Sequence, residues 1–351
     1  MRGRRALFVT RGGDTISTVN SELTSVSADE AVLFSNGEMK TYSGLTPSTT
    51  TSIEGVDVRT LPQPGTFLSR IATTNDVHFG ELECGRSGDT DDGPIFTVNE
   101  GDEPYPALMN RLGVGEIAAV SPDLMVVKGD LTAEGRDQEF QDFLRCYESV
   151  FRDRLLYVRG NHDCYEGQSF ADWPFQEVTI EGVIVALLDT SRPHQINGSL
   201  SHEQLEQLDE LGERADRPVI VFGHHPIWDE RYEPRSDDVF SLQPGPTEGL
   251  LEVFARRPRL VSYAAGHTHR NHVVEISGVP FVEVASLKDF PGSWCEYQVF
   301  DGGILQIVRR VQHRDAVAWT EKTRRMFGGA YGDYAFGSIE ERCRLIETTQ
   351  V

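Results

Sequence analysis

Five short runs of β-forming residues in this 351-residue chain each end in a polar motif, and these motifs hold six of the ten histidines. Random placement does not explain that clustering. In open α/β sheets, ligands bind in the crevice beyond the carboxyl ends of the strands, so these strand ends are candidates for a binding site. The motifs are Asp76-Val77-His78, Gly129-Asp130, Gly160-Asn161-His162-Asp163, Gly223-His224-His225 and Gly266-His267-Thr268-His269.

The composition indicates which partners the protein can bind and in which cellular compartment it is found. A net charge of -22 argues against a nucleic-acid partner, which would need a basic face, and an anionic substrate would need bound cations to attract it. Five scattered cysteines without a CxxC motif indicate free thiols in a reducing compartment. The apolar run at residues 6–9 is too short for a signal peptide, and no stretch is long enough to span a membrane. We therefore expect a cytoplasmic protein without a membrane partner, and leave a homodimer open.

The chain divides into three parts by pattern. Residues 1–64 contain short β segments separated by Ser, Thr, Gly and Pro, which predicts a small all-β domain. Residues 65–315 alternate strands and helices, as in an α/β layered fold, and residues 316–351 read as a tail that packs on the core. The piece 44–49 resembles the last turn of a fibronectin type III-like domain, although Thr51 stands where that family usually has tyrosine.

Two local patterns refine the α/β part. Ser201 and Gln204 form a capping box, which predicts a helix start and makes His202 a first-turn residue rather than a ligand. Strand-like runs around Val273, Val282, Tyr297 and Ile307 predict a second sheet. Imidazole with carboxylate suits zinc, manganese or iron, and no cysteine lies in a motif, so a structural zinc–thiolate site is not expected.

The order of the five motifs resembles the signature of the calcineurin-like metallophosphoesterase superfamily, which runs D-x-H, GD, GNH(D/E), H and GHxH. The match covers residues 70–312, and every signature position is filled. The resemblance implies an α/β fold of the four-layer sandwich type, with two mixed β-sheets flanked by helices. It also implies two metal ions (Mn, Fe or Zn): one held by Asp76, His78, Asp130 and His269, the other by Asp130, Asn161, His224 and His267.

The same resemblance implies a reaction. Two cations about 3.5–4 Å apart clamp a phosphoryl group and turn a bridging water into hydroxide near neutral pH. His162 is then placed to protonate the leaving group, and Asp163 is a candidate to orient it. His225 is expected either to touch the substrate phosphate or to be structural. The alternative for the whole set is a metal-holding regulatory module without hydrolysis.

Details of the motifs indicate which branch of this superfamily the chain resembles most. Ala133 stands where purple acid phosphatases have a tyrosine ligand, and the Gly129-Asp130-Leu131-Thr132 start is most similar to the class III cyclic nucleotide phosphodiesterases. We therefore favour hydrolysis of small phosphodiesters, cyclic nucleotides among them, with phosphomonoesters as the alternative. The loop 227–243 offers Trp228 to stack on a base and Arg231 to hold a phosphate; the alternative is that its aromatics only pack the loop.

Overall fold

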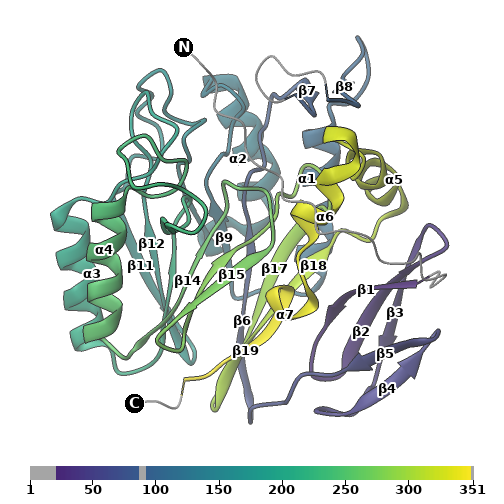
Figure 1. Cartoon of the computed structure of the whole chain (residues 1–351), viewed down its shortest axis with the longest axis horizontal. Helices are drawn as coiled ribbons and strands as arrows, with labels where there is room; N and C mark the ends of the chain where they lie inside the picture. Colours follow the sequence, from purple (N-terminus) through teal and green to yellow (C-terminus); the bar gives the residue numbers. More distant parts are fainter. Residues whose placement is uncertain (1–20, 87–91, 349–351) are drawn as a thin grey trace.

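Two six-stranded mixed sheets form the centre of the computed structural model, which describes residues 21–86 and 92–348 (Figure 1). In the first sheet β10, β9 and β6 are parallel, and β17, β18 and β19 continue it antiparallel. In spatial order its strands are β10 (Leu155–Val158), β9 (Leu124–Lys128), β6 (Phe67–Thr74), β17 (Ser293–Phe300), β18 (Gly303–Arg310) and β19 (Cys343–Ile346).

In the second sheet, four parallel strands lie between two antiparallel edge strands. The four parallel strands include three whose residues are all buried, as expected for strands covered on both faces. In spatial order the strands are β11 (Phe175–Ile180), β12 (Val183–Leu188), β13 (Val219–Phe222), β14 (Leu260–Ala265), β16 (Val279–Glu283) and β15 (His272–Ile276).

Helices cover the outer faces of both sheets, which gives the predicted four layers. On the first sheet lie α1 (Tyr105–Ala119), α2 (Asp137–Phe151) and α5 (Arg314–Thr323); on the second lie α3 (His202–Arg214) and α4 (Pro244–Arg256) (Figure 1). The middle core consists of apolar side chains from both sheets, among them Ile71, Phe222 and Tyr297. The predicted capping box is confirmed, since Ser201 Oγ accepts from the backbone N–H of Gln204 at the start of α3.

The four strand-like runs predicted as a second sheet do not stay together. The runs around Val273 and Val282 join β14, whereas those around Tyr297 and Ile307 join β6 in the other sheet. The expectation of one further sheet was therefore wrong. Strands that are neighbours in the sequence carry no local signal for the sheet that each one joins. β17, for example, pairs with β6, whose residues lie more than 200 positions earlier in the chain.

The described part of the N-terminal segment forms two small antiparallel units, at the lower right of Figure 1. Their apolar residues, such as Leu33 and Val58, share a cluster with Leu305 and Ile307 of β18. We retain residues 1–64 as a proposed domain, of which 1–20 lie outside the described residues. The strands are β1 (Ser21–Val26), β2 (Glu30–Ser35) and β3 (Glu38–Ser43), and the hairpin β4 (Thr50–Ile53) with β5 (Val56–Arg59).

The C-terminal segment runs past the front of β17 and β18 and ends as an edge strand of the first sheet (Figure 1). Arg342 ties it to the N-terminal unit, since its buried guanidinium donates to the carbonyls of Leu23 and Thr24. The elements are η2 (Phe327–Gly329), α6 (Ala330–Phe336), α7 (Ile339–Arg342) and β19; the remaining short elements of the chain are β7 (Glu83–Cys84), β8 (Phe96–Thr97) and η1 (Arg152–Arg154).

Candidate metal centre

The five predicted motifs meet at the carboxyl ends of β6, β9, β10, β13 and β14. Five motif residues have left-handed backbone conformations, with φ between 44° and 70°, which are uncommon for residues with a Cβ and cluster at functional sites. Gly160 is required by close approach, because a Cβ there would lie 2.3 Å from Asp130 Oδ1. The five residues are Asp76, His78, Asp130, His267 and His269.

Within this cluster, sets of three side chains place one ligand atom each within 4.8 Å of one another. Asp76 and Asp130 each belong to two sets, so the sets overlap at the two carboxylates. Asn161 joins them through its Oδ1, which lies 3.1 Å from His224 Nε2. The sets are Asp76/His78/His269, Asp76/Asp130/His224, His78/Asp130/His162 and His224/His225/His267.

His78 tests whether this cluster fits a metal ion. Both of its ring nitrogens are buried and lack a hydrogen-bond partner, which is costly for an imidazole in a protein interior. Its Nε2 lies 3.4 Å from Asp130 Oδ2 and its Nδ1 lies 3.4 Å from Glu81 Oε2. A cation at Nε2 would satisfy both this nitrogen and the carboxylate, so the residues fit a metal.

In two of the other histidines, a hydrogen bond to a backbone carbonyl determines which ring nitrogen is left to bind a metal ion. A carbonyl can only accept, so His224 Nδ1 donates to Lys128 O at 2.8 Å and Nε2 is left for a ligand. His267 Nε2 donates to Phe240 O at 2.8 Å, which leaves Nδ1. Such outer hydrogen bonds set the tautomer and orientation of metal-binding histidines.

The electrostatics of the cluster keep its carboxylates ionised. Burial opposes ionisation of Asp130, but the adjacent His224 and His162 hold the pKa of its carboxyl well below the usual range. Burial likewise opposes ionisation of Asp76, and His269 lowers the pKa of that carboxyl. Two carboxylates among imidazoles form a donor set suited to a divalent cation.

A layer of groups behind the ligands was not predicted. Asp289 Oδ2 lies 3.3 Å from His269 Nδ1, as Glu81 lies beside His78. The ammonium of Lys288 lies 2.7 Å from Glu81 and 3.5 Å from Asp289, so it bridges the two acids. Asp289 lies six residues beyond the end of β16 at Glu283, so it belongs to no strand-end motif and the sequence offers no local signal for it.

His162 lies beside the cluster with one ring nitrogen already used. Its Nδ1 donates to Ala133 O at 2.7 Å, and its ring centroid lies 4.6 Å from that of His78. Its backbone N–H donates to Asp130 Oδ1 at 3.0 Å. Nε2 is therefore the nitrogen available for proton transfer.

The structure corrects the role predicted for Asp163. Its carboxylate makes no contact with the His162 ring among the described interactions. It accepts instead from the backbone N–H groups of Gly160, Leu131 and Thr132 and from Thr132 Oγ1, at 2.6–3.0 Å. Side chains of adjacent residues diverge in this turn, so Asp163 joins its own loop to the Asp130 loop.

His225 is likewise occupied by the protein. Thr190 Oγ1 donates to its Nδ1 at 2.8 Å, and its Nε2 donates to Ile196 O at 3.1 Å. The ring is completely buried, and burial holds its pKa well below the usual range. Of the two predicted roles, these contacts match the structural one.

Trp228 and Arg231, the other predicted substrate contacts, are engaged within their own loop. The Trp228 indole N–H donates to Glu233 O at 3.0 Å, and the Arg235 guanidinium lies over the ring. Arg231 forms a bidentate pair with Asp229. These contacts match the packing alternative. Phe240, an exposed aromatic residue of the same loop, lies beside His267 instead.

Sequence reasoning also missed Tyr165. Asn161 Nδ2 donates to the Tyr165 hydroxyl at 2.5 Å, while Asn161 Oδ1 faces His224. The hydroxyl thereby turns the amide so that its oxygen points to the cluster.

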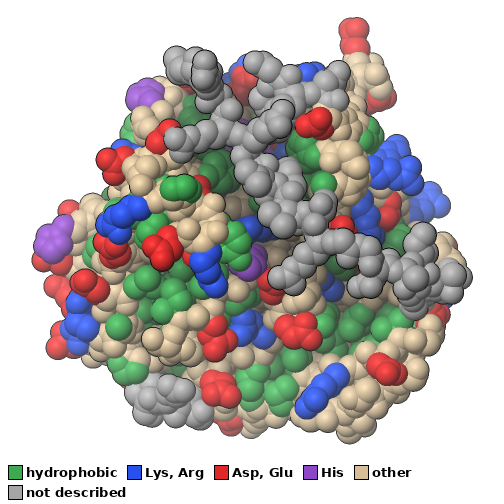
Figure 2. Space-filling model, in the orientation of Figure 1, with side chains coloured by type: hydrophobic (Ala, Val, Ile, Leu, Met, Phe, Trp, Pro, Cys, Tyr) green, Lys and Arg blue, Asp and Glu red, His purple; other side chains and the backbone are tan. Residues whose placement is uncertain are grey.

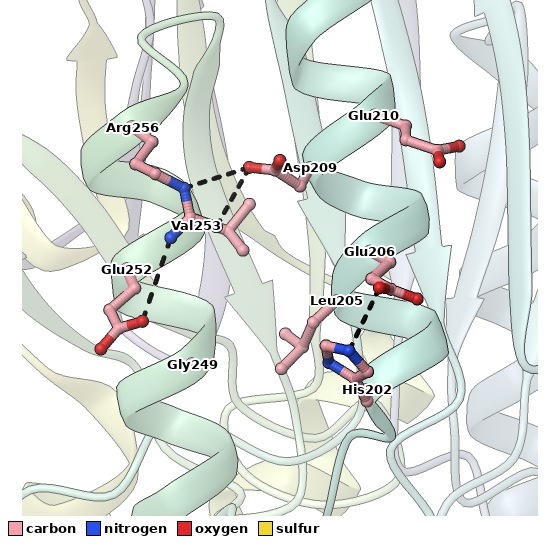
Figure 3. Close-up of a pocket in the computed structure, with 9 residues that line it drawn as sticks. All are labelled: His202, Leu205, Glu206, Asp209, Glu210, Gly249, Glu252, Val253 and Arg256. Atoms are coloured by element: carbon pink, nitrogen blue, oxygen red, sulfur yellow. Dashed lines mark hydrogen bonds and ion pairs between the residues drawn. The ribbon is translucent and has the colours of Figure 1, made fainter.

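A separate groove of about 560 Å³ lies on the outer surface between α3 and α4 (Figure 3). Four of its nine lining residues are acidic, among them Asp209 on α3 and Glu252 on α4. His202 belongs to this groove and pairs with Glu206 at 3.1 Å, as suits an exposed first-turn residue. On the face of the molecule shown in Figure 2, acidic and basic side chains are intermixed.

A four-layer α/β sandwich with Asp, Asn and His at five strand ends defines the class of metallophosphoesterases. The sequence matches the family described as calcineurin-like phosphoesterase over residues 69–271, more than half of the chain, and the chain belongs to this family. It is thus, by class, a metal-dependent hydrolase of phosphoric esters.

Two curated relatives and one solved structure extend the comparison. The chain is 29% identical to a probable cyclic nucleotide phosphodiesterase of Synechococcus, over 48% of this chain and 69% of that protein. It is 33% identical to a probable glycerophosphodiester phosphodiesterase of Arcobacter nitrofigilis, over 42% of this chain and 57% of that protein. A dimetal phosphatase from Danio rerio has the same fold, with a TM-score of 0.56 and 16% identity over 70% of this chain and 97% of that one.

No helix within residues 21–86 and 92–348 combines the length and the apolar character needed to cross a membrane.

Proposed function

We propose that the protein is a dinuclear metal-dependent phosphodiesterase that hydrolyses small phosphodiesters. The position of Asp130 carries the proposal. Its Oδ2 lies 3.4 Å from His78 Nε2 and its Oδ1 lies 3.4 Å from His224 Nε2. The two oxygens of one carboxylate therefore face two separate groups of ligands, as a residue shared by two cations must.

The residues divide into two proposed ligand sets. When bound, the cations would polarise the phosphoryl group and supply a nucleophilic water near neutral pH. The nitrogen and oxygen donors suit manganese, iron or zinc. The first set is Asp76, His78, Asp130 and His269; the second is Asp130, Asn161, His224 and His267.

His162 is the proposed proton donor to the leaving oxygen. The Ala133 carbonyl holds Nδ1–H in place, so Nε2 carries the proton that can be transferred. Loss of that proton leaves a neutral imidazole that keeps its bond to Ala133. Asp163 contributes indirectly, because its hydrogen bonds hold the His162 and Asp130 loops together.

The names of the relatives favour diesters, since they include a cyclic nucleotide and a glycerophosphodiester phosphodiesterase. Hydrolysis of phosphomonoesters is the second candidate, and a metal-binding regulatory module the third. We also propose a cytoplasmic location, because all five cysteines are free and four of them are buried.

The test is a comparison of bis(4-nitrophenyl) phosphate with 4-nitrophenyl phosphate on protein loaded with manganese, iron or zinc. We expect the larger kcat/KM for the diester with at least one metal. A larger value for the monoester would support the second candidate. Protein that binds metal but hydrolyses neither ester would support the regulatory module.

A further inference from the structure

Phe240 is an exposed aromatic residue held directly against a proposed metal ligand. Its ring stacks on the His267 ring, with centroids 4.0 Å apart and planes inclined by 29°, and its own carbonyl accepts from His267 Nε2. Nevertheless 42% of the residue remains exposed to solvent. One face of an aromatic ring is thus covered by the centre, while a large part of the residue is available to a ligand.

The loop that carries Phe240 is held in place. The Glu233 carboxylate accepts from the backbone N–H of Phe240 at 2.6 Å and from Ser241 Oγ at 2.6 Å, and the Glu233 carbonyl accepts from Trp228. A ring fixed in this way loses little conformational entropy when a ligand packs on it.

Ile196 is a second exposed apolar residue, and it lies on the neighbouring loop. It is 43% exposed, and its carbonyl accepts from Nε2 of His225, whose ring centroid lies 4.5 Å from that of His267. The two loops are joined by a hydrogen bond from Gly198 N to Ser241 O at 3.1 Å. Ile196 and Phe240 thus lie on two hydrogen-bonded loops, next to His225 and His267 respectively, and we call this pair of exposed apolar residues the apolar edge.

The apolar edge lies beside the second ligand set, whereas His162 lies against His78 of the first. With the leaving arm placed at His162, the side of the second ligand set is open to the arm that stays on phosphorus. We propose that the apolar edge binds the retained arm of the substrate, and that this arm carries a flat ring, either a simple aryl group or a nucleobase. This inference rests on the proposed phosphodiesterase function and adds the substrate class.

Three esters with the same leaving group provide the test. All release 4-nitrophenolate, and they differ only in the retained arm: methyl 4-nitrophenyl phosphate, bis(4-nitrophenyl) phosphate and the 4-nitrophenyl ester of thymidine 5′-monophosphate. We expect the metal-loaded protein to prefer a ring-bearing arm over methyl. Phe240→Ala should reduce that preference in kcat/KM about tenfold, the effect of losing one aromatic stacking partner. If bis(4-nitrophenyl) phosphate is the better substrate, the favoured ring is a simple aryl group. If the thymidine ester is better, the favoured ring is a nucleobase.

Two further variants make the result decisive. Phe240→Leu keeps bulk over His267 but removes the flat face, so the preference should fall there too. Tyr232→Ala is the matched control, because Tyr232 is an exposed aromatic of the same loop that contacts His272 instead. Metal content is measured in each variant, and it should not change, since the backbone of Phe240 supplies the bond to His267.

The outcomes separate the two proposals. Hydrolysis of all three esters with no preference for a ring, or an unchanged preference in Phe240→Ala and Phe240→Leu, would overturn the apolar edge and leave the phosphodiesterase proposal standing. Failure of metal-loaded wild-type protein to hydrolyse any of the three would overturn the phosphodiesterase proposal itself. If Phe240→Ala loses metal, the comparison of Phe240→Leu with wild type decides.

Discussion

Asp289 Oδ2 lies 3.3 Å from Nδ1 of His269, while Nε2 of the same ring lies 3.5 Å from Asp76. The imidazole is thus placed between a carboxylate behind it and the cluster in front of it. A carboxylate in that outer position orients a histidine ligand and raises its basicity. Tyr331 in turn donates to Asp289 Oδ1 at 2.8 Å, so α6 supports the arrangement.

This relationship predicts that Asp289→Asn weakens metal binding at the first ligand set. We expect the affinity to fall about 10–100-fold, because the orienting charge is lost while the shape is kept. Competition with a chromogenic chelator would measure it. Glu296→Gln is the control, since Glu296 is a buried carboxylate bonded to Arg70 and Arg309 instead. Equal affinities in wild type and Asp289→Asn would contradict the prediction.

Asp130→Ala is expected to remove both metal ions and abolish hydrolysis, because its two oxygens face both ligand sets. His269→Ala should mainly reduce occupancy of one site. Elemental analysis of the purified variants, with unfolding temperatures as the check on folding, measures both effects. A fully loaded and active Asp130→Ala protein would rule out the shared-ligand assignment.

His162→Ala should lose activity in proportion to how much the leaving group needs a proton. General acid catalysis contributes about 10²–10⁴-fold, so diesters with alkyl leaving groups should lose about that factor. Esters that release 4-nitrophenolate should lose much less. Both metals should remain bound. Equal losses on the two kinds of ester would instead make His162 a positioning residue or a ligand.

Arg342→Ala is expected to destabilise the fold without touching the metal centre. Its buried guanidinium donates to the carbonyls of Leu23, Thr24, Phe336 and Gly337. Leaving these acceptors unpaired should lower the free energy of unfolding by about 2–4 kcal/mol. Denaturant titration measures the change, with the exposed Arg235→Ala as control. A loss below about 0.5 kcal/mol would show that the linkage is dispensable.

The clustering of the proposed ligands could be predicted because all seven lie just beyond the ends of five strands, whereas their division into two metal sites came from the resemblance to the family. Asp163 and His225 were harder, since each is adjacent to a proposed functional residue and only the local turn decides where its side chain points. Glu81, Asp289 and Tyr331 carry no motif. Their roles depend on how distant segments pack, which local patterns do not encode. The sheet entered by β17 was unpredictable for the same reason.

The path of the C-terminal segment has a consequence for how the protein matures. During synthesis all seven proposed ligands, from Asp76 to His269, leave the ribosome before Tyr331 and Arg342. The side chain that steadies Asp289 and the one that joins the end of the chain to β1 therefore arrive after the cluster is complete in sequence. A metal ion captured early would meet a His269 without its full outer support, so we expect the protein to retain that ion more tightly once α6 has docked.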